Sequence, residues 1–523
     1  MRHAPSRRLE TDVLIIGGGL AGCWAAITAA QAGAKVVIVE KGYCGTSGVA
    51  ASAGPGHWFI PPEGTLRRDA ITRRLEMAEG LGDADWMETI IDRTFRTLPT
   101  IASHYRYTQD DNGKIRYHAL RGPEYLRALR QKALDSGVII LDHSPALKFF
   151  RHDDGSVAGA TGVSLKSELD RWSIRAGATI LATGGCAFRS HLLGSSNNTG
   201  DGLLMAAEAG ACFSGMEFSA FFTIVPATTT MARTMIYSFA RYYDGAGHEL
   251  ERPASPHNNH FLAEMLRTGP VFCDLSRVPD DIRSQLPQIS PNVPLTFQRL
   301  GIDPFTQRFP ISLVGEGTIR GVGGIWVTNR HAGCDVPGLY VAGDVASREP
   351  VTGAISGGGA VNAAWALSSG CIAAESAVAY TRKQRRSLKE PIIPSPEYET
   401  VTRDHKAVER AVQDEMLSPH KQYFRTAFSL EKSSQALEAA WQQLSGDTVQ
   451  NTNARAQLRQ HELKALAAAS RWCTASALAR KESRGIHYRT DSETVETPTH
   501  ILSGGIANPW TRSVPVKAFS GLS

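Results

Sequence analysis

Three glycines near the start of the chain, Gly17, Gly19 and Gly22, form a GxGxxG pattern directly after the apolar run "DVLII". In this spacing the first glycine permits a tight turn and the second lets a pyrophosphate approach the backbone. The third allows close packing of a helix on a strand. Glu40 follows the next apolar run, "VVIV", where its carboxylate can accept hydrogen bonds from an adenosine ribose. The pattern predicts dinucleotide binding, with the phosphates at the N-terminus of a helix.

The elements that must position these residues are strands that end in glycine. The sequence predicts a buried parallel strand over 12–19, a helix closing at Gly33, and a second strand over 35–42. Two later apolar runs, "GATILATGG" (177–185) and "GLYVAGDVA" (338–346), have the same strand character. Runs of this kind indicate an α/β fold with a parallel sheet, to which the chain returns after long excursions.

Composition and charge argue against several other classes of protein. A net charge of +5 over 523 residues, without a dense Lys/Arg stripe, argues against nucleic-acid binding. The eight cysteines occur singly, so neither a zinc or other metal site nor an iron–sulfur cluster is expected within this chain. The long apolar stretch 13–39 contains the glycine cluster, so we expect no membrane span. Single cysteines without a signal peptide favour a cytoplasmic location.

Three segments carry a resemblance to a known family: "TGDGLLMAAEAGA" (199–211), "GLYVAGDVA" and "ESRGIHYR" (482–489). With them the chain resembles the flavoprotein subunits of the fumarate reductase/succinate dehydrogenase superfamily, which includes L-aspartate oxidase and the alpha chain of adenylylsulfate reductase. The resemblance implies an α/β, Rossmann-type split FAD-binding domain with an inserted α+β capping domain and a C-terminal helical domain. The expected boundaries are 1–215 and 311–385 for the FAD-binding domain, 216–310 for the capping domain, 386–400 for a linker, 401–485 for the helical domain, and 486–523 for a tail without regular pattern.

The same resemblance implies that FAD is the cofactor. In the family pattern the Asp of "AGD", here Asp344, binds the ribityl chain of the flavin. The helix that starts in "SGGGAVNAAWAL" would point its N-terminus at the flavin pyrimidine and stabilise negative charge there. The expected FAD contacts are Gly17, Gly19, Gly22, Glu40, Lys41, Ser47, Gly48, Thr183, Gly184, Asp201, Asp344, Ser356, Gly357 and Val361.

Three positions depart from the pattern of the family members that act on dicarboxylates. Those members carry a substrate-binding His in a run like QFHPT, where "GMEFSAFFTIVP" (215–226) places Phe222, and a second His where "TIRGVGG" places Ile319. The segment therefore reads as an active-site wall that lacks these His residues; the alternative is that Phe222 is simple core. Respiratory members attach FAD covalently to a His, where this chain has Ser47, so the FAD is expected to be non-covalent.

Three residues are candidates for catalysis. Arg241 lies in "FARYYDG", similar to a run in which family members carry an Arg that contacts an anionic substrate. The alternative for Arg241 is a surface residue paired with Asp244. His57 in "GPGHWF" and Arg320 are further candidates, since each follows or precedes a segment expected to face the flavin.

The resemblance implies an FAD-dependent oxidoreductase that acts on a small, anionic substrate by hydride or electron-pair transfer at flavin N5. Its motifs are nearer to adenylylsulfate reductase than to the respiratory enzymes. One alternative is an electron-transfer subunit that works with a separate iron–sulfur or ferredoxin-like partner. Another is a flavin-binding protein whose site does not turn over. The sequence does not name the substrate, the electron acceptor or the oligomeric state.

Overall fold

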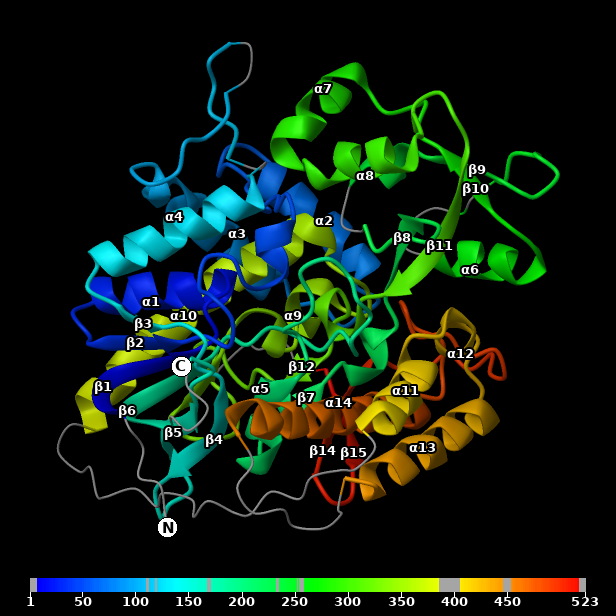
Figure 1. Cartoon of the computed structure of the whole chain (residues 1–523). Helices are drawn as coiled ribbons and strands as arrows, with labels where there is room; N and C mark the ends of the chain where they lie inside the picture. Colours follow the sequence, from blue (N-terminus) through cyan, green and yellow to red (C-terminus); the bar gives the residue numbers. More distant parts are fainter. Residues whose placement is uncertain are drawn as a thin grey trace.

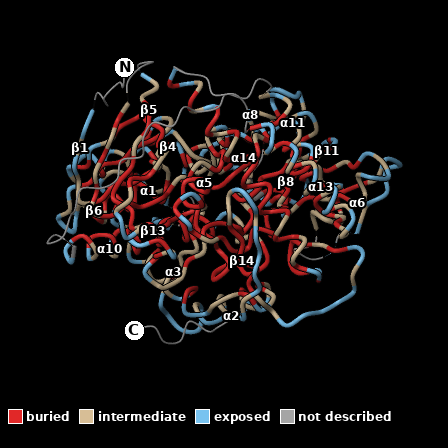
Figure 2. The backbone as a smooth tube through the Cα atoms, turned by 90° about the horizontal axis from the view of Figure 1, so that it is seen from below, coloured by how far each residue is buried: buried red, intermediate tan, exposed pale blue. Residues whose placement is uncertain are grey.

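The computed structural model describes residues 7–109, 112–117, 120–166, 171–231, 235–251, 253, 258–384, 405–444 and 453–516. The predicted linker 386–400 lies outside these residues. A mixed sheet with its helices, a second sheet with helices α6 to α8, and a group of C-terminal helices occupy different parts of the molecule (Figure 1). Buried backbone runs through all three, and exposed backbone lies mainly at the rim (Figure 2). The α/β fold class with capping and helical parts is confirmed.

The mixed sheet has seven strands in the order β3-β2-β1-β6-β5-β4, and β13 also pairs with β6. The parallel strands are β1 (Arg7–Ile16), β2 (Val36–Val39), β3 (Ile139–Leu141), β6 (Arg171–Leu181) and β13 (Leu339–Val341). Strands β4 (Ala146–Arg151) and β5 (Val157–Val163) are antiparallel to their neighbours. Because β1, β6 and β13 are parallel neighbours, the glycine and aspartate segments that follow them meet at one edge of the sheet.

Helices α1 (Leu20–Gln31) and α10 (Gly358–Gln384) pack against each other beside this sheet, and α4 (Gly122–Asp135) lies next to α1 (Figure 1). Gly370 permits the close approach, because a Cβ there would lie 2.5 Å from the carbonyl oxygen of Ala21. The indole of Trp24 donates to the hydroxyl of Tyr125 at 2.9 Å and ties α1 to α4. The helix that opens the dinucleotide site is thus held on two sides.

A four-stranded antiparallel sheet, β8-β11-β10-β9, forms the core of the predicted capping domain. Its strands are β8 (Phe222–Pro226), β9 (Arg241–Tyr243), β10 (Phe272–Asp274) and β11 (Phe309–Gly315). Helices α6 (Asn258–Thr268), α7 (Asp280–Ile289) and α8 (Asn292–Leu300) accompany it (Figure 1). Strand β11 crosses the predicted boundary at residue 310. The division of the chain into domains remains a prediction.

The C-terminal segment contains regular structure that the sequence did not reveal. Strands β14 (Thr499–Gly504) and β15 (Trp510–Pro515) form a hairpin, and β14 continues into β7 (Phe213–Ser214) and β12 (Gly324–Ile325). The expectation of a tail without regular pattern over 486–523 is therefore wrong for this part. The indole of Trp472 donates to the carbonyl of Gly505 at 2.8 Å and joins the hairpin to the helices.

The C-terminal helices are α11 (His405–Met416), α12 (Pro419–Tyr423), α13 (Ala427–Gln442) and α14 (Ala454–Ala479). Helix α14 is the most deeply buried of them, since its small residues allow close neighbours on several sides. The face predicted from its 3.6-residue period is buried: Leu463, Leu466, Ser470, Cys473 and Ala477.

Candidate cofactor and active site

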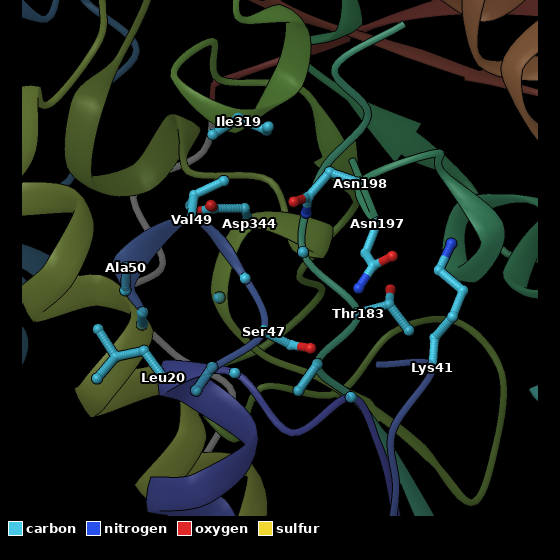
Figure 3. A pocket seen from close by; sticks show the side chains of 18 of the residues that line it. Leu20, Lys41, Ser47, Val49, Ala50, Thr183, Asn197, Asn198, Ile319 and Asp344 are labelled. Carbon is cyan, nitrogen blue, oxygen red and sulfur yellow. The ribbon is translucent and has the colours of Figure 1, made fainter. Parts of the chain in front are cut away.

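One elongated pocket lies at the edge where β1, β6 and β13 end, and it encloses about 1420 Å³ that includes space open to solvent. This exceeds the roughly 300–1,000 Å³ usual for drug-sized ligands, as a dinucleotide requires. Figure 3 shows its two ends, with Lys41 and Thr183 at one and Ile319 and Val49 at the other. Ten of the residues expected to contact FAD line it: Gly17, Gly19, Glu40, Lys41, Ser47, Gly48, Thr183, Gly184, Asp201 and Asp344.

The glycine loop leaves room for a phosphate. Gly17 has φ +107°, and a Cβ on it would lie 2.3 Å from the carbonyl oxygen of Ala182. A Cβ on Gly22 would lie 1.9 Å from the carbonyl oxygen of Gly17, so Gly22 serves packing and does not line the pocket. A Cβ on Gly19 would meet nothing within 4 Å, because this residue faces the open pocket at the N-terminus of α1. A pyrophosphate fits at this position.

The Glu40 carboxylate is buried and fixed by backbone donors. One oxygen accepts from the N–H of Gly18 at 2.6 Å and the other from the N–H of Gly42 at 2.7 Å. A carboxylate has about four acceptor positions, so both oxygens can still accept from a ribose. Glu40 thereby couples the glycine loop to the residue expected at the adenosine.

Lys41 is engaged by protein groups. Its ammonium lies 2.7 Å from Asp201 and 2.9 Å from Glu462 on α14, and it donates to the hydroxyl of Thr199 at 2.8 Å. Burial disfavours its charge, but the two carboxylates outweigh burial and raise its pKa. Lys41 and Asp201 therefore line the pocket as a fixed pair joined to the C-terminal helices.

Several buried polar atoms in the pocket wall have no partner within the described chain. They are Oγ1 of Thr183, Oδ1 of Asn198, and both side-chain polar atoms of Asn362 in the second turn of α10. Such atoms cost free energy unless a ligand satisfies them. Together with the open glycine cradle they fit FAD, whose ribityl and pyrimidine groups offer hydrogen-bonding partners along this length.

The sequence placed the α10 contacts a few residues too early. Ser356, Gly357 and Val361 do not line the pocket, whereas Gly359 and Asn362 do. The helix begins at Gly358, so the residues that face the pocket lie in its first turns. Asn362 was missed because an asparagine inside an alanine-rich helix gives no motif. Asn198 is marked only by its place in "NNTGDG".

At the other end of the pocket, Asp344 is paired with Arg348, a fully buried residue. The Arg348 guanidinium also donates to the backbone carbonyls of Thr318 and Ile319 at 2.9 and 3.0 Å, and to the carbonyl of Gly321. Burial lowers the pKa of Arg348, and Asp344 opposes this shift. Arg348 therefore fixes the expected ribityl contact and the segment 318–321 against each other.

Arg320 is the catalytic candidate that the structure brings to the pocket. It lines the pocket wall, and its guanidinium carbon lies 4.9 Å from the centre of the Phe221 ring. Its Nε is buried and has no hydrogen-bond partner among the described residues. A cation held over an aromatic ring with unused donors is suited to binding an anion.

His57 is buried behind the pocket and does not line it. Its Nε2 lies 3.2 Å from the Tyr125 hydroxyl, and burial lowers the pKa of the ring to about 3. The neutral imidazole serves packing between α4 and the segment that follows the glycine loop. The structure does not support a catalytic role for His57.

Arg241 lies away from the pocket on strand β9. Its guanidinium binds both carboxylate oxygens of Glu249, while Asp244 is bonded to His248. The expected pairing with Asp244 is therefore wrong. Because β9 pairs with β10 at the far side of the capping sheet from β8, Arg241 does not line the pocket, and the structure does not support its catalytic role.

The two positions expected to replace substrate-binding His residues differ in their surroundings. Ile319 lines the pocket and is 2% exposed, as expected for a wall residue. Phe222 packs against Tyr423 with ring centres 5.2 Å apart and against Gly315, in the core of the capping sheet. The wall interpretation fits Ile319, and the core alternative fits Phe222.

Among the described residues, no group of three or more His, Cys, Asp or Glu side chains is arranged to hold a metal ion. In the same part of the chain, no helix has the length and apolar character needed to span a membrane. The eight cysteines are all free thiols.

Comparison with known proteins agrees with this site. A family model described as FAD dependent oxidoreductase matches residues 12–192, and one described as fumarate reductase flavoprotein C-term matches 409–501. The first contains the glycine loop, and the second contains helices α13 and α14. The chain belongs to the FAD-dependent oxidoreductases of the fumarate reductase/succinate dehydrogenase flavoprotein superfamily, and its cofactor is FAD.

Full-length relatives have different activities. The chain is 26% identical to a named subunit of the fumarate reductase (CoM/CoB) of Methanothermobacter marburgensis, over 93% of this chain and 95% of that protein. It is also 26% identical to L-aspartate oxidase of Mycobacterium tuberculosis, over 93% of both chains.

Two solved structures share the fold over nearly their whole length. E. coli quinol fumarate reductase FrdA superposes with a TM-score of 0.81 at 20% identity, covering 99% of this chain and 98% of that one. Adenylylsulfate reductase of Archaeoglobus fulgidus superposes with a TM-score of 0.78 at 18% identity, covering 100% and 98%.

Proposed function

We propose that this flavoprotein oxidises or reduces a small anionic substrate at the Arg320 end of the pocket. The observation that carries the proposal is the Arg320 guanidinium, which lines the pocket over the Phe221 ring and has a buried Nε without a partner in the described chain. FAD, when bound, exchanges a hydride or electron pair at its N5 atom. The protein supplies binding, orientation and charge.

Each part of the pocket has a separate task in this proposal. Glu40 and the glycine loop hold the adenosine and the pyrophosphate, which directs the flavin toward Ile319. Arg320 binds the anion and orients it, and it stabilises negative charge that develops in the transition state. The apolar side chains of Ile319 and Val49 exclude water from the same end, which strengthens the attraction between Arg320 and the anion.

We further propose that the FAD is bound without a covalent link and that succinate and fumarate are poor substrates. Ser47 lines the pocket, and an aliphatic hydroxyl cannot form the histidyl link. Ile319 offers no hydrogen bond where dicarboxylate enzymes are expected to carry a His. Each hydrogen bond to a charged group that is lost costs about 1.5–3 kcal/mol.

Anaerobic bleaching of the bound flavin tests the proposal. Amino acids, hydroxy acids, dicarboxylates and sulfur anions are added in turn to the oxidised holoenzyme, and candidate acceptors are added to the dithionite-reduced one. We expect at least one anionic class to change the flavin oxidation state, and uncharged analogues such as the corresponding amides to be inert. Bleaching by amides as fast as by acids would contradict the role given to Arg320.

A second candidate is an electron-transfer flavoprotein that works with a separate iron–sulfur partner. The fumarate reductase (CoM/CoB) relative supports it, since that protein is named as one subunit of its enzyme. Co-expression with a neighbouring iron–sulfur protein, followed by size-exclusion chromatography, tests this candidate. A stable complex whose clusters are reduced through the flavin favours it, and turnover by the isolated chain with a soluble acceptor favours the first proposal.

A further inference from the structure

The charged residues that line the pocket differ in whether their charge is already used. Glu40 accepts two backbone N–H groups, Lys41 and Asp201 form an ion pair, and Asp344 is bound by Arg348. Of the charged residues that line the pocket in the described part of the chain, Arg320 alone has neither a hydrogen bond nor an ion pair. The described pocket therefore offers one cation to an added anion.

The surroundings of this cation are apolar. The Phe221 ring lies beneath the guanidinium, and the neighbouring Ile319 is almost fully buried. Val49 and Ala50 lie at the same end of the pocket, away from Lys41 (Figure 3). None of the described residues that line the pocket is a histidine. A second negative group on the substrate would lose its hydration here and find no described cation in return.

From these observations we infer that the substrate carries a single anionic group on an apolar body, as in a monocarboxylate. The inference rests on the proposed function, because it assigns Arg320 to the substrate. Arg320 binds the anionic group, and the apolar end of the pocket receives the remainder of the molecule. A carboxylate and a sulfonate offer the same oxygen acceptors to a guanidinium, so the test includes both.

Ligand binding to the oxidised holoenzyme tests the charge count directly. Hexanoate, hexane-1-sulfonate and adipate have the same six-carbon chain, and only adipate carries a second charge. Affinities are measured by calorimetry and by the shift of the flavin absorption bands. We expect one of the two monoanions to bind at least tenfold more tightly than adipate. We also expect affinity to rise about threefold to fourfold per added methylene from acetate to hexanoate.

Three variants separate this inference from the proposed function. Arg320→Gln should weaken monoanion binding at least tenfold, and Arg320→Lys should weaken it less and keep the preference over adipate. The matched control is Arg241→Gln, which removes an arginine bound to Glu249 outside the pocket and should change nothing.

The outcomes have distinct meanings. Adipate binding as tightly as hexanoate, with both lost in Arg320→Gln, overturns the single-charge inference but keeps Arg320 as the anion site. Equal binding by the wild type and Arg320→Gln, or no binding of any anion, overturns the inference and the proposed function together.

Discussion

Asp344 and Arg348, four residues apart, form an ion pair of 2.5 Å that joins the two parts of the candidate active site. Asp344 lines the pocket where the flavin ribityl chain is expected, and Arg348 is buried behind it. The same guanidinium holds the carbonyls on both sides of Arg320, those of Ile319 and Gly321. The position of the substrate cation is therefore linked to the residue that faces the cofactor.

Arg348→Lys tests this link. A lysine keeps the charge but cannot make the same fan of hydrogen bonds, and each lost bond to a charged group is worth about 1.5–3 kcal/mol. We expect FAD to bind about tenfold more weakly and anion binding to the remaining holoenzyme to weaken by a similar factor. Both are measured by titration. Arg425→Lys is the control, since Arg425 is also buried but holds Glu217 and Gln422 outside the pocket. An unchanged FAD affinity in Arg348→Lys would remove the link.

Glu40→Gln should release FAD more easily. The glutamine presents an amide N–H₂ group to one of the two backbone N–H groups that the carboxylate now accepts. We expect the dissociation constant of FAD to rise tenfold to a hundredfold, corresponding to about 1.4–2.8 kcal/mol. Flavin fluorescence during dialysis measures it. Glu438→Gln, a surface residue paired with Arg471, should keep the wild-type value. A wild-type dissociation constant for Glu40→Gln would contradict its assignment to the adenosine end.

Acid precipitation should free all of the flavin. Ser47 stands in the pocket wall, and its hydroxyl accepts from the N–H of Tyr43 at 2.9 Å. We expect yellow flavin in the supernatant after trichloroacetic acid treatment of the wild type and of Ser47→Ala alike. Flavin fluorescence on the denatured polypeptide band would show a covalent bond and refute the non-covalent assignment.

The glycine loop, Glu40, Thr183, Gly184 and Asp344 were predictable from the sequence because they follow parallel strands. Apolar runs that end in glycine mark such strands, and their carboxyl ends meet at one edge. The resemblance supplied the order of the remaining parts, and the family comparisons confirm it.

Other features depend on contacts that local sequence does not encode. The motif around Arg241 suggested an active-site arginine, but the pairing of β9 with β10 carries it to the outer part of the capping sheet. Strand β14 is defined by pairing with β7, nearly three hundred residues earlier in the chain. Arg348 gave no signal, because its role comes from three carbonyls that only the folded segment 318–321 presents.

Acid should destabilise the protein partly through His57. Burial lowers its pKa to about 3 from 6.5, so the unfolded chain binds a proton below pH 6.5 that the folded chain refuses. Stability is therefore lost as the pH falls from 6.5 toward 3, by about 2 kcal/mol at pH 5. In His57→Gln the loss between pH 7 and pH 5, measured by urea unfolding, should be smaller by about this amount. The exposed control His191→Asn should keep the wild-type slope. An equal slope in His57→Gln would show that the ring is solvated.

The most direct test of the account is the rate of flavin reduction or oxidation by an anionic substrate, compared in Arg320→Gln and Arg241→Gln by anaerobic stopped flow. Arg320 lines the pocket without an ionic partner among the described residues, and Arg241 is bound to Glu249 outside it. We predict that Arg320→Gln lowers the rate by about 10²–10³-fold with FAD still bound, the range for losing one positioned donor. Arg241→Gln should react at the wild-type rate. The reverse result, a wild-type rate for Arg320→Gln and a large loss for Arg241→Gln, would contradict the account.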